Sequence, residues 1–579
     1  MKLDKNILGI DFGTTNSKMA YILLDEPVMI ENSEGKKITP SIVYFKNEDE
    51  VAVGEIAKRN LIINPENTVS SVKREMGTDF KKKIGRYKFP PEYIGAHIFK
   101  KLSDDAEKQI GKKFTDAVVS VPANYSDGQR QAIKDAAEIA GLNILRMINE
   151  PTAAALSYGI REDRDRRILV YDFGGGTFDV SILSVSSGFF DVDSSAGEHK
   201  LGGDDIDARI EEHVRKKLYE QMGIDAKNDL ALHATLREAS EEAKIALSYS
   251  ESTTINIPFV AANKPPFSMM LTRIELNRMI GDLIERTKKP IEQALTDASL
   301  EKTEIDDILL VGGTTLIPAV REFVTQYFGK EPLKGDPYEA VALGAAVASM
   351  EYGKEKSNKA KNIEISDVIS SSLGIFTADA GVSKILERNT KIPIARTRNF
   401  TNAGDFAEEV IINVYQGESE RPEDCEHLGD FWVSVEPLPA DEDKIEVTFE
   451  VGKEFGILNV TAVEKISGSQ RSVKMEARSR LSKKDKSKWM KKMLDMESIE
   501  VDVTNISTRD SLTLFLNPRQ TILDLKKELK EKGLMEDNEL IFFDDIELSD
   551  ERKISEANIT NGCKLEIRNT IRKDEQEKE

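Results

Sequence analysis

Two segments of the 579-residue chain place an aspartate and a small-residue turn directly after a short apolar run. Residues 7–12 read ILGIDF before Gly13-Thr14-Thr15-Asn16, and residues 168–173 read ILVYDF before Gly174-Gly175-Gly176-Thr177. Glycine lacks a Cβ and tolerates positive φ, so backbone N–H groups in such turns can approach a phosphate. The threonine hydroxyls add donors, and a hydrated Mg²⁺ can be held by carboxylates at the strand ends, here Asp11 and Asp172. The pattern predicts two phosphate-binding loops.

The elements around these loops repeat as well. Each turn leads into a second β-rich run, at residues 19–23 and 178–183, and a third apolar run at 305–313 also ends in glycines. One glycine turn after a strand is commonly only a hairpin. Three of them, two with acidic strand ends, predict a two-lobed α/β protein whose phosphate loops face each other across a cleft.

The rest of the chain divides by composition. Residues 127–140 and 232–248 carry apolar residues at helical spacing, and Asp127 is the expected N-cap of the first helix. Residues 354–362 read KEKSNKAKN, which is typical of a linker. Between 370 and 478, alternating apolar residues predict an antiparallel sheet with one buried face. A basic helix is expected over 482–496.

The last 80 or so residues predict a separate small domain. Residues 499–503 and 512–516 alternate around a turn, Thr521 and Asp524 have the spacing of a capping box, and short strands are expected at 540–543 and 564–568. This order is ββαββ, a β-grasp fold, followed by a charged tail at 570–579. The expected domains are 1–353, 370–480 and 498–569, joined by a linker at 354–369 and a helix at 481–497.

The composition excludes several classes of protein. Lys and Arg total 81 and Asp and Glu total 102, a net charge of −21, which disfavours nucleic acid and anionic membranes as partners. The two cysteines and five histidines show no metal-binding spacing, and no apolar run approaches the ~20 residues of a membrane span. We expect a cytoplasmic protein that binds no membrane.

Six segments, in order, closely resemble those of actin-like ATPases and, within that fold, of the Hsp70 (DnaK-type) chaperones. The resemblance covers about residues 1–480 and rests on IDFGTTNSKMA (10–20), VKREMG (72–77), the stretch 121–159, DFGGGTFDVSIL (172–183), LGGDDID (201–207) and LLVGGTTLIP (309–318). It implies an ATPase that uses ATP/ADP, Mg²⁺ and K⁺.

The resemblance also implies residue roles. Lys73, within VKREMG, would lie over the γ-phosphate, with Glu150, Asp172 and Thr177 completing the catalytic set. Asp11, Asp172 and Asp179 would serve the metal ions. The nucleotide would be held by Gly13, Thr14, Thr15, Asn16, Gly174, Gly175, Gly176, Glu241, Lys244, Ser248, Gly312, Gly313 and Thr314.

The sheet at 370–478 is similar to the peptide-binding β-sandwich of that family. The residues expected to line its cleft are Ile375, Ala378, Phe400, Ala403, Val410, Ile412 and Ile457. The alternative is that they are ordinary sandwich core, and for Val410 and Ile412 by themselves the core is favoured. An interdomain switch would include Pro122, Arg130, Arg146 and Asp367, the last two at positions that the family uses to engage J-domain co-chaperones.

Three departures from the family stand out. Leu316 stands where an arginine usually stacks on adenine and Ile245 flanks the same position, which predicts weaker nucleotide binding. The leucine-rich linker is reduced to Ile363-Glu364-Ile365-Ser366. The helical lid is replaced by residues 498–568, which look like a ubiquitin-like domain with Ile541 at the centre of its usual surface patch.

The favoured function is an ATP-dependent chaperone of the Hsp70 type that binds unfolded or extended segments. Its partners would be unfolded clients, a J-domain co-chaperone, a nucleotide exchange factor and a protein recruited by the ubiquitin-like domain. Two alternatives stay open. One is an actin-like sugar or metabolite kinase, and the other is a nucleotide-gated adaptor or holdase that works through the ubiquitin-like domain.

Overall fold

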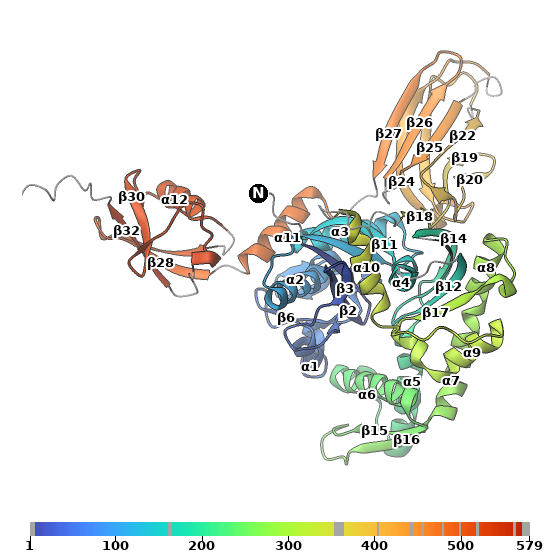
Figure 1. Cartoon of the computed structure of the whole chain (residues 1–579), viewed down its shortest axis with the longest axis horizontal. Coiled ribbons are helices and arrows are strands. Elements are labelled where there is room, and N and C mark those ends of the chain that lie inside the picture. The colour runs from blue at the N-terminus through green and yellow to red at the C-terminus, as the bar shows by residue number, and fades with distance from the viewer. Residues whose placement is uncertain are drawn as a thin grey trace, which may run out of the picture. The chain divides into compact units, whose positions relative to one another are not determined.

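The computed structural model describes residues 6–159, 165–186, 188–352, 364–401, 404–439, 445–452, 457–476, 480–496, 499–516, 520–557, 559 and 563–569. The chain forms two compact units, Met1–Ser482 and Lys483–Glu579. The expected tail at 570–579 and the linker residues 354–363 lie outside the described residues. The first unit contains both expected phosphate loops and the expected sandwich (Figure 1).

The first phosphate loop follows the central strand of a mixed sheet. Strand β1 (Ile7–Asp11) is parallel to β10 (Asp116–Val121) and antiparallel to β2 (Asn16–Leu23), so the loop connects β1 to β2. The sheet order is β11-β10-β1-β2-β3, with β11 (Asn143–Asn149), β3 (Glu26–Met29) and the short β4 (Thr39–Pro40) beside β2.

The second phosphate loop repeats this arrangement. Strand β12 (Arg166–Phe173) is parallel to β17 (Asp307–Val311) and antiparallel to β13 (Phe178–Ser186), and the sheet order is β17-β12-β13-β14-β18-β21. Its further strands are β14 (Phe189–Glu198), β18 (Glu364–Val368) and β21 (Lys391–Ile392). The predicted repetition of strand, turn and strand is confirmed.

Helices α4 (Glu150–Gly159) and α10 (Ala340–Ser349) bring the two sheets together. Helix α10 packs on β1 and β2, helix α4 packs on β12 and β13, and both share one apolar core (Figure 1). A methyl group added to Gly344 would lie 1.6 Å from the Ala153 carbonyl oxygen, so the two helices approach as closely as glycine permits. The phosphate loops are thereby fixed on a rigid double core.

The remaining elements of this region surround the two sheets. Helix α6 (Leu230–Tyr249) and helix α3 (Asp127–Ile139) match the predicted helices, but α3 is capped by Ser126, in a capping box with Gln129, rather than by Asp127. The other elements are α1 (Glu55–Ile63), α2 (Pro91–Ile110), α5 (Gly203–Met222), α7 (Arg273–Arg286), α8 (Lys288–Asp297), α9 (Pro318–Phe328), β5 (Val43–Phe45), β6 (Val51–Val53), β7 (Thr68–Val69), β8 (Lys82–Ile84), β9 (Tyr87–Phe89), β15 (Ser252–Ile257) and β16 (Phe267–Thr272).

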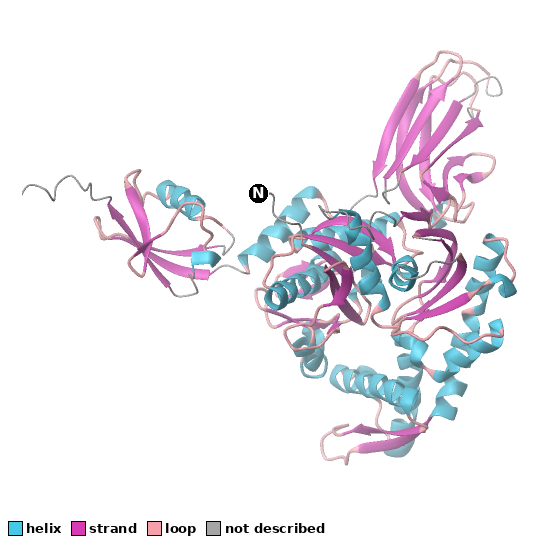
Figure 2. Cartoon of the chain, in the orientation of Figure 1, coloured by secondary structure: helices cyan, strands magenta, loops and turns pink. Residues whose placement is uncertain are grey.

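Two four-stranded antiparallel sheets follow (Figure 2), where the alternation predicted an antiparallel sheet and the resemblance implied a β-sandwich. They have the orders β20-β19-β23-β24 and β22-β25-β26-β27, and their facing apolar side chains form one core. The strands are β19 (Leu373–Thr377), β20 (Gly381–Leu386), β22 (Ile394–Phe400), β23 (Glu409–Gln416), β24 (Glu426–Ser434), β25 (Ile445–Val451), β26 (Ile457–Glu464) and β27 (Gln470–Glu476).

The described end of the expected linker forms a strand. Strand β18 is parallel to β14, through Phe189–Asp191, and antiparallel to β21, which belongs to the sandwich region. The polypeptide that leaves the nucleotide region therefore extends its second sheet and joins that sheet to the sandwich.

The second unit begins with helix α11 (Lys483–Asp495), whose bounds nearly match those of the basic helix expected over 482–496. A five-stranded sheet of order β29-β28-β32-β30-β31 follows, with helix α12 (Ile522–Glu531) packed on it through Ile522, Leu525 and Leu529. The strands are β28 (Ile499–Asn505), β29 (Ser511–Leu516), β30 (Glu539–Phe543), β31 (Ile546–Glu547) and β32 (Cys563–Asn569). The predicted capping box of Thr521 and Asp524 is confirmed.

The expected surface position of Ile541 is wrong. Its side chain is 0% exposed and lies in the core of this sheet, whereas its neighbour Leu540 faces the other side and pairs with Arg568 across β30 and β32. Because side chains alternate along a strand, a shift of one residue moves every side chain to the opposite face.

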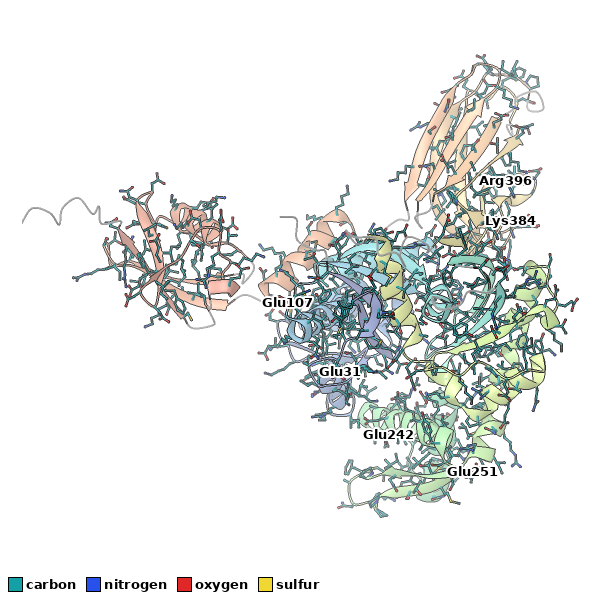
Figure 3. All side chains as sticks on the ribbon, viewed as in Figure 1. Glu31, Glu107, Glu242, Glu251, Lys384 and Arg396 are labelled. Atoms are coloured by element: carbon teal, nitrogen blue, oxygen red, sulfur yellow. The ribbon has the colours of Figure 1, made fainter. Side chains whose placement is uncertain are left out.

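Several acidic side chains lie on the surface of the chain. Glu31, Glu107, Glu242 and Glu251 are exposed and are labelled in Figure 3. In the described parts of the chain, no helix combines the length and the apolar character that crossing a bilayer requires.

Candidate active site

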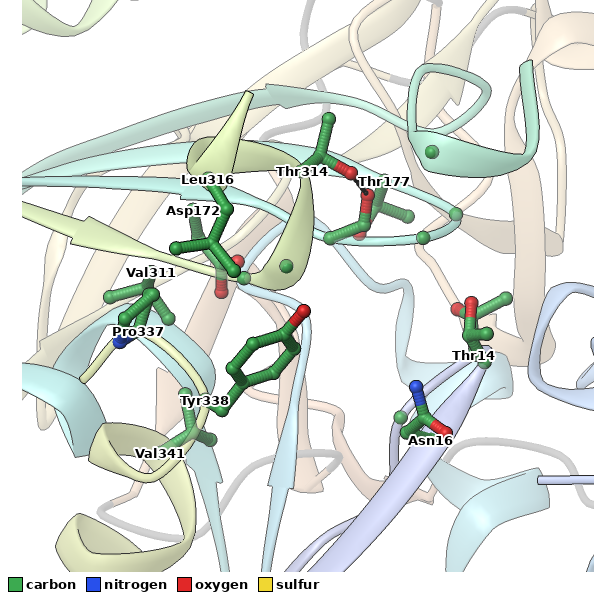
Figure 4. A pocket seen from close by; sticks show the side chains of 18 of the residues that line it. Thr14, Asn16, Asp172, Thr177, Val311, Thr314, Leu316, Pro337, Tyr338 and Val341 are labelled. Atoms are coloured by element: carbon green, nitrogen blue, oxygen red, sulfur yellow. Dashed lines mark hydrogen bonds between the residues drawn. The ribbon is translucent and has the colours of Figure 1, made fainter. Parts of the chain in front are cut away.

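A pocket lies between the two phosphate loops and is lined by all three glycine turns (Figure 4). Every residue that the sequence assigned to catalysis or to nucleotide binding lines it. These are Gly13, Thr14, Thr15, Asn16, Lys73, Glu150, Asp172, Gly174, Gly175, Gly176, Thr177, Glu241, Lys244, Ser248, Gly312, Gly313 and Thr314. The pocket thus brings together residues from positions 11 to 341 of the chain.

The two phosphate loops face each other directly. A methyl group added to Gly175 would lie 2.1 Å from the Thr15 hydroxyl, and one added to Gly176 would lie 2.7 Å from the Thr14 hydroxyl. The second loop is backed by α5, since the amides of Gly203 and Asp204 donate to the carbonyls of Gly174 and Gly175. Backbone and hydroxyl donors from both lobes therefore surround one small space, as binding of a polyphosphate requires.

Lys73 is buried at the centre of this end of the pocket. It lies in the 3₁₀ helix η2 (Val72–Glu75), is 4% exposed and forms an ion pair with Glu150 at the start of α4. The Tyr125 hydroxyl donates to the Lys73 carbonyl at 2.9 Å. Burial is the largest single influence and opposes the charge of Lys73, but Glu150, Tyr125 and Asp11 together outweigh it and raise the pKa of the lysine, so the ammonium group persists.

Carboxylates outnumber cations around this ammonium group. Lys18 pairs with Asp11 at 2.5 Å, while burial and the nearby Glu150 raise the pKa of Asp172 well above its usual range and that of Asp179 to about 7. Thr177 and the Asn124 amide are the neighbouring donors of Asp179, but neither forms a hydrogen bond of good geometry to its 1% exposed carboxylate within the described part of the chain. A buried carboxylate without a partner is costly, and a cation relieves that cost.

These carboxylates do not form a ready-made metal cage. Among the described residues, no three His, Cys, Asp or Glu side chains converge closely enough to hold an ion by themselves. The residues therefore suit a hydrated Mg²⁺, which usually keeps several waters and is bound by one or two carboxylates together with substrate phosphates. Asp11, Asp172 and Asp179 are the carboxylates that would face such an ion.

The opposite end of the pocket is less charged. Its polar side chains are paired with neighbours: Lys244 with Asp207 at 2.8 Å, Glu241 with Lys58 at 3.2 Å, and Ser248 with the Lys244 carbonyl. The apolar Leu316 and Ile245 line the same end, as expected from the sequence. The Thr314 hydroxyl donates to the Gly174 carbonyl at 2.8 Å, which ties the third glycine turn to the second.

Comparisons with known proteins decide the family. A family model described as Hsp70 protein matches residues 7–86 and 81–559. The chaperone protein DnaK of Thermotoga neapolitana is 41% identical over 535 residues, which cover 91% of this chain and 89% of that protein. The chain belongs to the Hsp70 family.

This Hsp70 is an ATP-dependent molecular chaperone, and its enzymatic activity is ATP hydrolysis. Its nucleotide-binding region has the two-lobed actin-like fold of the family, which works with ATP/ADP and Mg²⁺. Family members bind unfolded clients and act with co-chaperones. The match leaves the kinase and adaptor alternatives without support.

The expected switch residues of this Hsp70 are connected through a residue that the sequence did not single out. Arg130 is fully buried and donates to the carbonyls of Pro122, Ala123 and Tyr125 and to the Asn149 side chain at 2.8 Å. Asn149 in turn donates to Asp367 of β18 at 2.8 Å. Pro122, Arg130 and Asp367 thus form one network, whereas Arg146 pairs with Glu351 instead.

The expected peptide-binding residues of this Hsp70 lie mostly in the sandwich core. Ile375 and Ile412 are buried there, and Val410 and Phe400 pack against it, in agreement with the core alternative for Val410 and Ile412. Ala378 is exposed in the turn after β19, and Ile457 opens β26. Ala403 lies outside the described residues.

Several lining residues of the pocket were missed, and three of them carry polar groups. Lys18 pairs across β1 and β2 with Asp11, so the hairpin register could have revealed it. Tyr249 and Tyr338 also line the pocket, the first from the last turn of α6 and the second from the loop before α10. No local motif marks these two tyrosines.

Proposed function

We propose that ATP hydrolysis at this pocket controls the binding of unfolded or extended segments by the sandwich. In this proposal residues 1–353 are the ATPase domain, 370–480 bind peptide, and 498–569 are a ubiquitin-like domain in place of a helical lid. A J-domain co-chaperone and a nucleotide exchange factor would assist the cycle in the cytoplasm.

The chemistry follows from the buried charges. Lys73, held by Glu150, would stabilise the charge that develops on the γ-phosphate and orient the attacking water. Glu150 and Asp172 would position that water, and the Thr177 hydroxyl would contact the phosphates. Mg²⁺, held through Asp11, Asp172 and Asp179, would neutralise the phosphates, and K⁺ would serve the same anionic end.

The observation that carries the proposal is a chain of hydrogen bonds and adjacent residues that leads from Lys73 to the interdomain strand. Glu150, which pairs with Lys73, directly follows Asn149, which bonds to Asp367 of β18. A second route runs from the Lys73 carbonyl through Tyr125 and Arg130 to the same asparagine. A change at the γ-phosphate that moves Lys73 or Glu150 therefore disturbs the bonds that hold β18.

The sandwich is also attached to the ATPase region by polar contacts. The Asp127 amide, in the first turn of α3, donates to Gln416 of β23 at 3.2 Å. Asn389 accepts from the Ser195 amide and donates to Asp297 at 2.8 Å. Polar contacts of this kind can be exchanged for water, which suits an interface that forms in one nucleotide state and separates in another.

The absence of a helical lid in this proposal has a consequence for peptide release. A lid that closes over bound peptide slows its dissociation, so we expect fast exchange from the sandwich. The five-stranded sheet and helix of the second unit support a ubiquitin-like domain, because the strand order places two parallel strands, β28 and β32, at its centre. Such a domain would recruit a partner protein.

The experiment measures the affinity and dissociation rate of a labelled extended apolar peptide with ATP and with ADP. The wild type should bind more weakly with ATP, because the coupling network links the two domains. Asn149→Ala removes the bonds to both Arg130 and Asp367, so the ratio of the two affinities should shrink several-fold while ATP binding persists. Asn143→Ala, on the same strand but with a side chain that donates to Asp116 rather than to Asp367, is the matched control.

Equal peptide affinities with ATP and ADP in the wild type would contradict the proposal and favour a constitutive holdase. An unchanged affinity ratio in Asn149→Ala would leave coupling intact and place its route elsewhere. Dissociation from the ADP form over many minutes would contradict the expectation of fast exchange.

A further inference from the structure

The base end of the nucleotide pocket has an unusual lining of apolar and aromatic side chains. Leu316, from the turn η5 (Gly313–Leu316), faces the same pocket as Ile245, Tyr249 and Tyr338. Ile245 and Tyr249 are 47% and 72% exposed, although both are large and apolar. They are four residues apart on α6 and therefore share one face of the helix. Such a face is suited to cover a flat, apolar ligand group.

Tyr338 presents its ring from the loop before α10. Figure 4 shows the ring projecting into the pocket that Leu316 also lines. A methyl group added to Gly313 would lie 2.9 Å from Tyr338 Cε1 and 3.0 Å from its hydroxyl, so the ring rests directly on the third glycine turn. A side chain at position 313 would collide with the ring, so the glycine is what leaves room for Tyr338 beside the turn.

The backbone of Tyr338 is fixed as well. Pro337 precedes Tyr338 in the chain. The backbone amide of Tyr338 donates to the Asp336 carboxylate at 2.8 Å, and helix α10 begins two residues after Tyr338, at Ala340. Burial and the nearby Tyr249 raise the pKa of the Tyr338 phenol, so the ring stays neutral at physiological pH. A fixed, neutral aromatic ring is a good stacking surface for a nucleobase.

We infer that Tyr338 is the stacking platform for the base of the bound nucleotide, with Ile245 and Tyr249 of α6 covering the other side. The inference rests on the proposed nucleotide site and adds a residue that fixes the orientation of the base. It also compensates for the absence of an arginine at position 316, because the Tyr338 ring takes over the stacking that the arginine would provide. Glu241, Lys244 and Ser248 keep hydrogen-bonding capacity beyond the neighbours that they contact, so stacking on Tyr338 adds to the polar contacts at this end.

The test separates the base from the phosphates. ATP, ADP and inorganic tripolyphosphate are titrated onto the full chain and its variants by calorimetry. Tyr338→Ala should weaken ATP and ADP about tenfold, the effect of losing one base–aromatic stack, and leave tripolyphosphate affinity unchanged. Tyr338→Phe should retain wild-type affinity. Tyr219→Ala, a tyrosine on the exposed face of α5, is the matched control.

A spectroscopic variant detects the stack itself. In Tyr338→Trp the added indole should be quenched by ATP but not by tripolyphosphate, a response that a purely structural role of residue 338 would not give. Unchanged ATP affinity in Tyr338→Ala, an equal loss for ATP and tripolyphosphate, or an indole that ATP leaves unquenched would each overturn the inference. If the wild type bound neither ATP nor tripolyphosphate, the proposed nucleotide site itself would fail instead.

Discussion

The two ends of the nucleotide pocket are built on opposite principles. At the phosphate end, Lys73 and the surrounding carboxylates are buried and held by turns that contact each other across the cleft. At the base end, large apolar side chains such as Tyr249 remain exposed, and the polar groups are paired with neighbours. Reaction chemistry demands fixed charges at fixed places, whereas a planar base needs only a surface of suitable shape.

The difference has an energetic side. Buried carboxylates such as Asp179 raise the free energy of the empty pocket, and this cost is relieved when cations bind. Ile245 and Tyr249 instead lose exposed apolar area when a base covers them, which stabilises the complex without prior strain. The phosphate end is therefore suited to bind ions and to catalyse a reaction, whereas the base end contributes binding affinity.

The largest expected effect comes from Lys73→Ala. Removing the ammonium group should lower the rate of ATP hydrolysis about 10²–10³-fold, because stabilisation of the developing charge is lost. Nucleotide affinity should change only a few-fold, since the turns and the base end remain. Single-turnover hydrolysis and equilibrium binding measure the two quantities separately. Lys83→Ala, an exposed lysine on β8, should affect neither. Hydrolysis within tenfold of wild type would remove the distinction between the two ends.

The next effect is on stability and depends on pH. The pKa of Asp179 rises from 3.8 to about 7 on folding. The folded state therefore binds the proton on Asp179 more tightly than the unfolded state does. The stabilisation of the folded state by this proton is complete below about pH 4 and is lost as the pH rises to about 7. Asp179→Asn should therefore raise the free energy of unfolding more at pH 8 than at pH 5, by roughly 2–3 kcal/mol.

Thermal and denaturant unfolding of the full chain without nucleotide or divalent ions measures this difference. Asp379→Asn, at an exposed turn of the sandwich, should show no pH-dependent gain. If Asp179→Asn raised the free energy of unfolding equally at both pH values, ionisation of Asp179 would not destabilise the folded state. The energetic contrast between the two ends of the pocket would then disappear.

The phosphate end was predictable from the sequence because its residues lie in short motifs. A strand, an aspartate and a glycine turn are contiguous, so Asp11, Asp172 and both turns were found. Lys18 needed the hairpin register in addition. Asn149 is next to Glu150 in the chain, but its partner Asp367 is 218 positions away and could be recognised only from the fold.

The base end resisted prediction for a related reason. Tyr249 and Tyr338 come from a helix end and a loop that meet only in the folded protein, and neither belongs to a motif with its own chemistry. Errors of one residue had large consequences elsewhere, as Ile541 shows: the strand was predicted correctly, but its register placed a core side chain on the surface. Likewise α3 begins at the expected place, yet Ser126 caps it.

The smallest expected effect comes from restoring a cation at the base end. Leu316→Arg adds a guanidinium group that can stack on the base, and an exposed contact of this kind contributes about 0.5–1 kcal/mol. Because Tyr338 already supports the base, the affinity for ATP should rise only about two- to fivefold. In a Tyr338→Ala background the same substitution should recover more of the lost affinity, since the two groups then compensate for each other. Leu316→Lys, a cation without the planar group, serves as the control in equilibrium titrations.

A gain of tenfold or more from Leu316→Arg in the wild-type background would mean that the aromatic lining leaves the base unsupported. The base end would then depend, like the phosphate end, on one charged side chain.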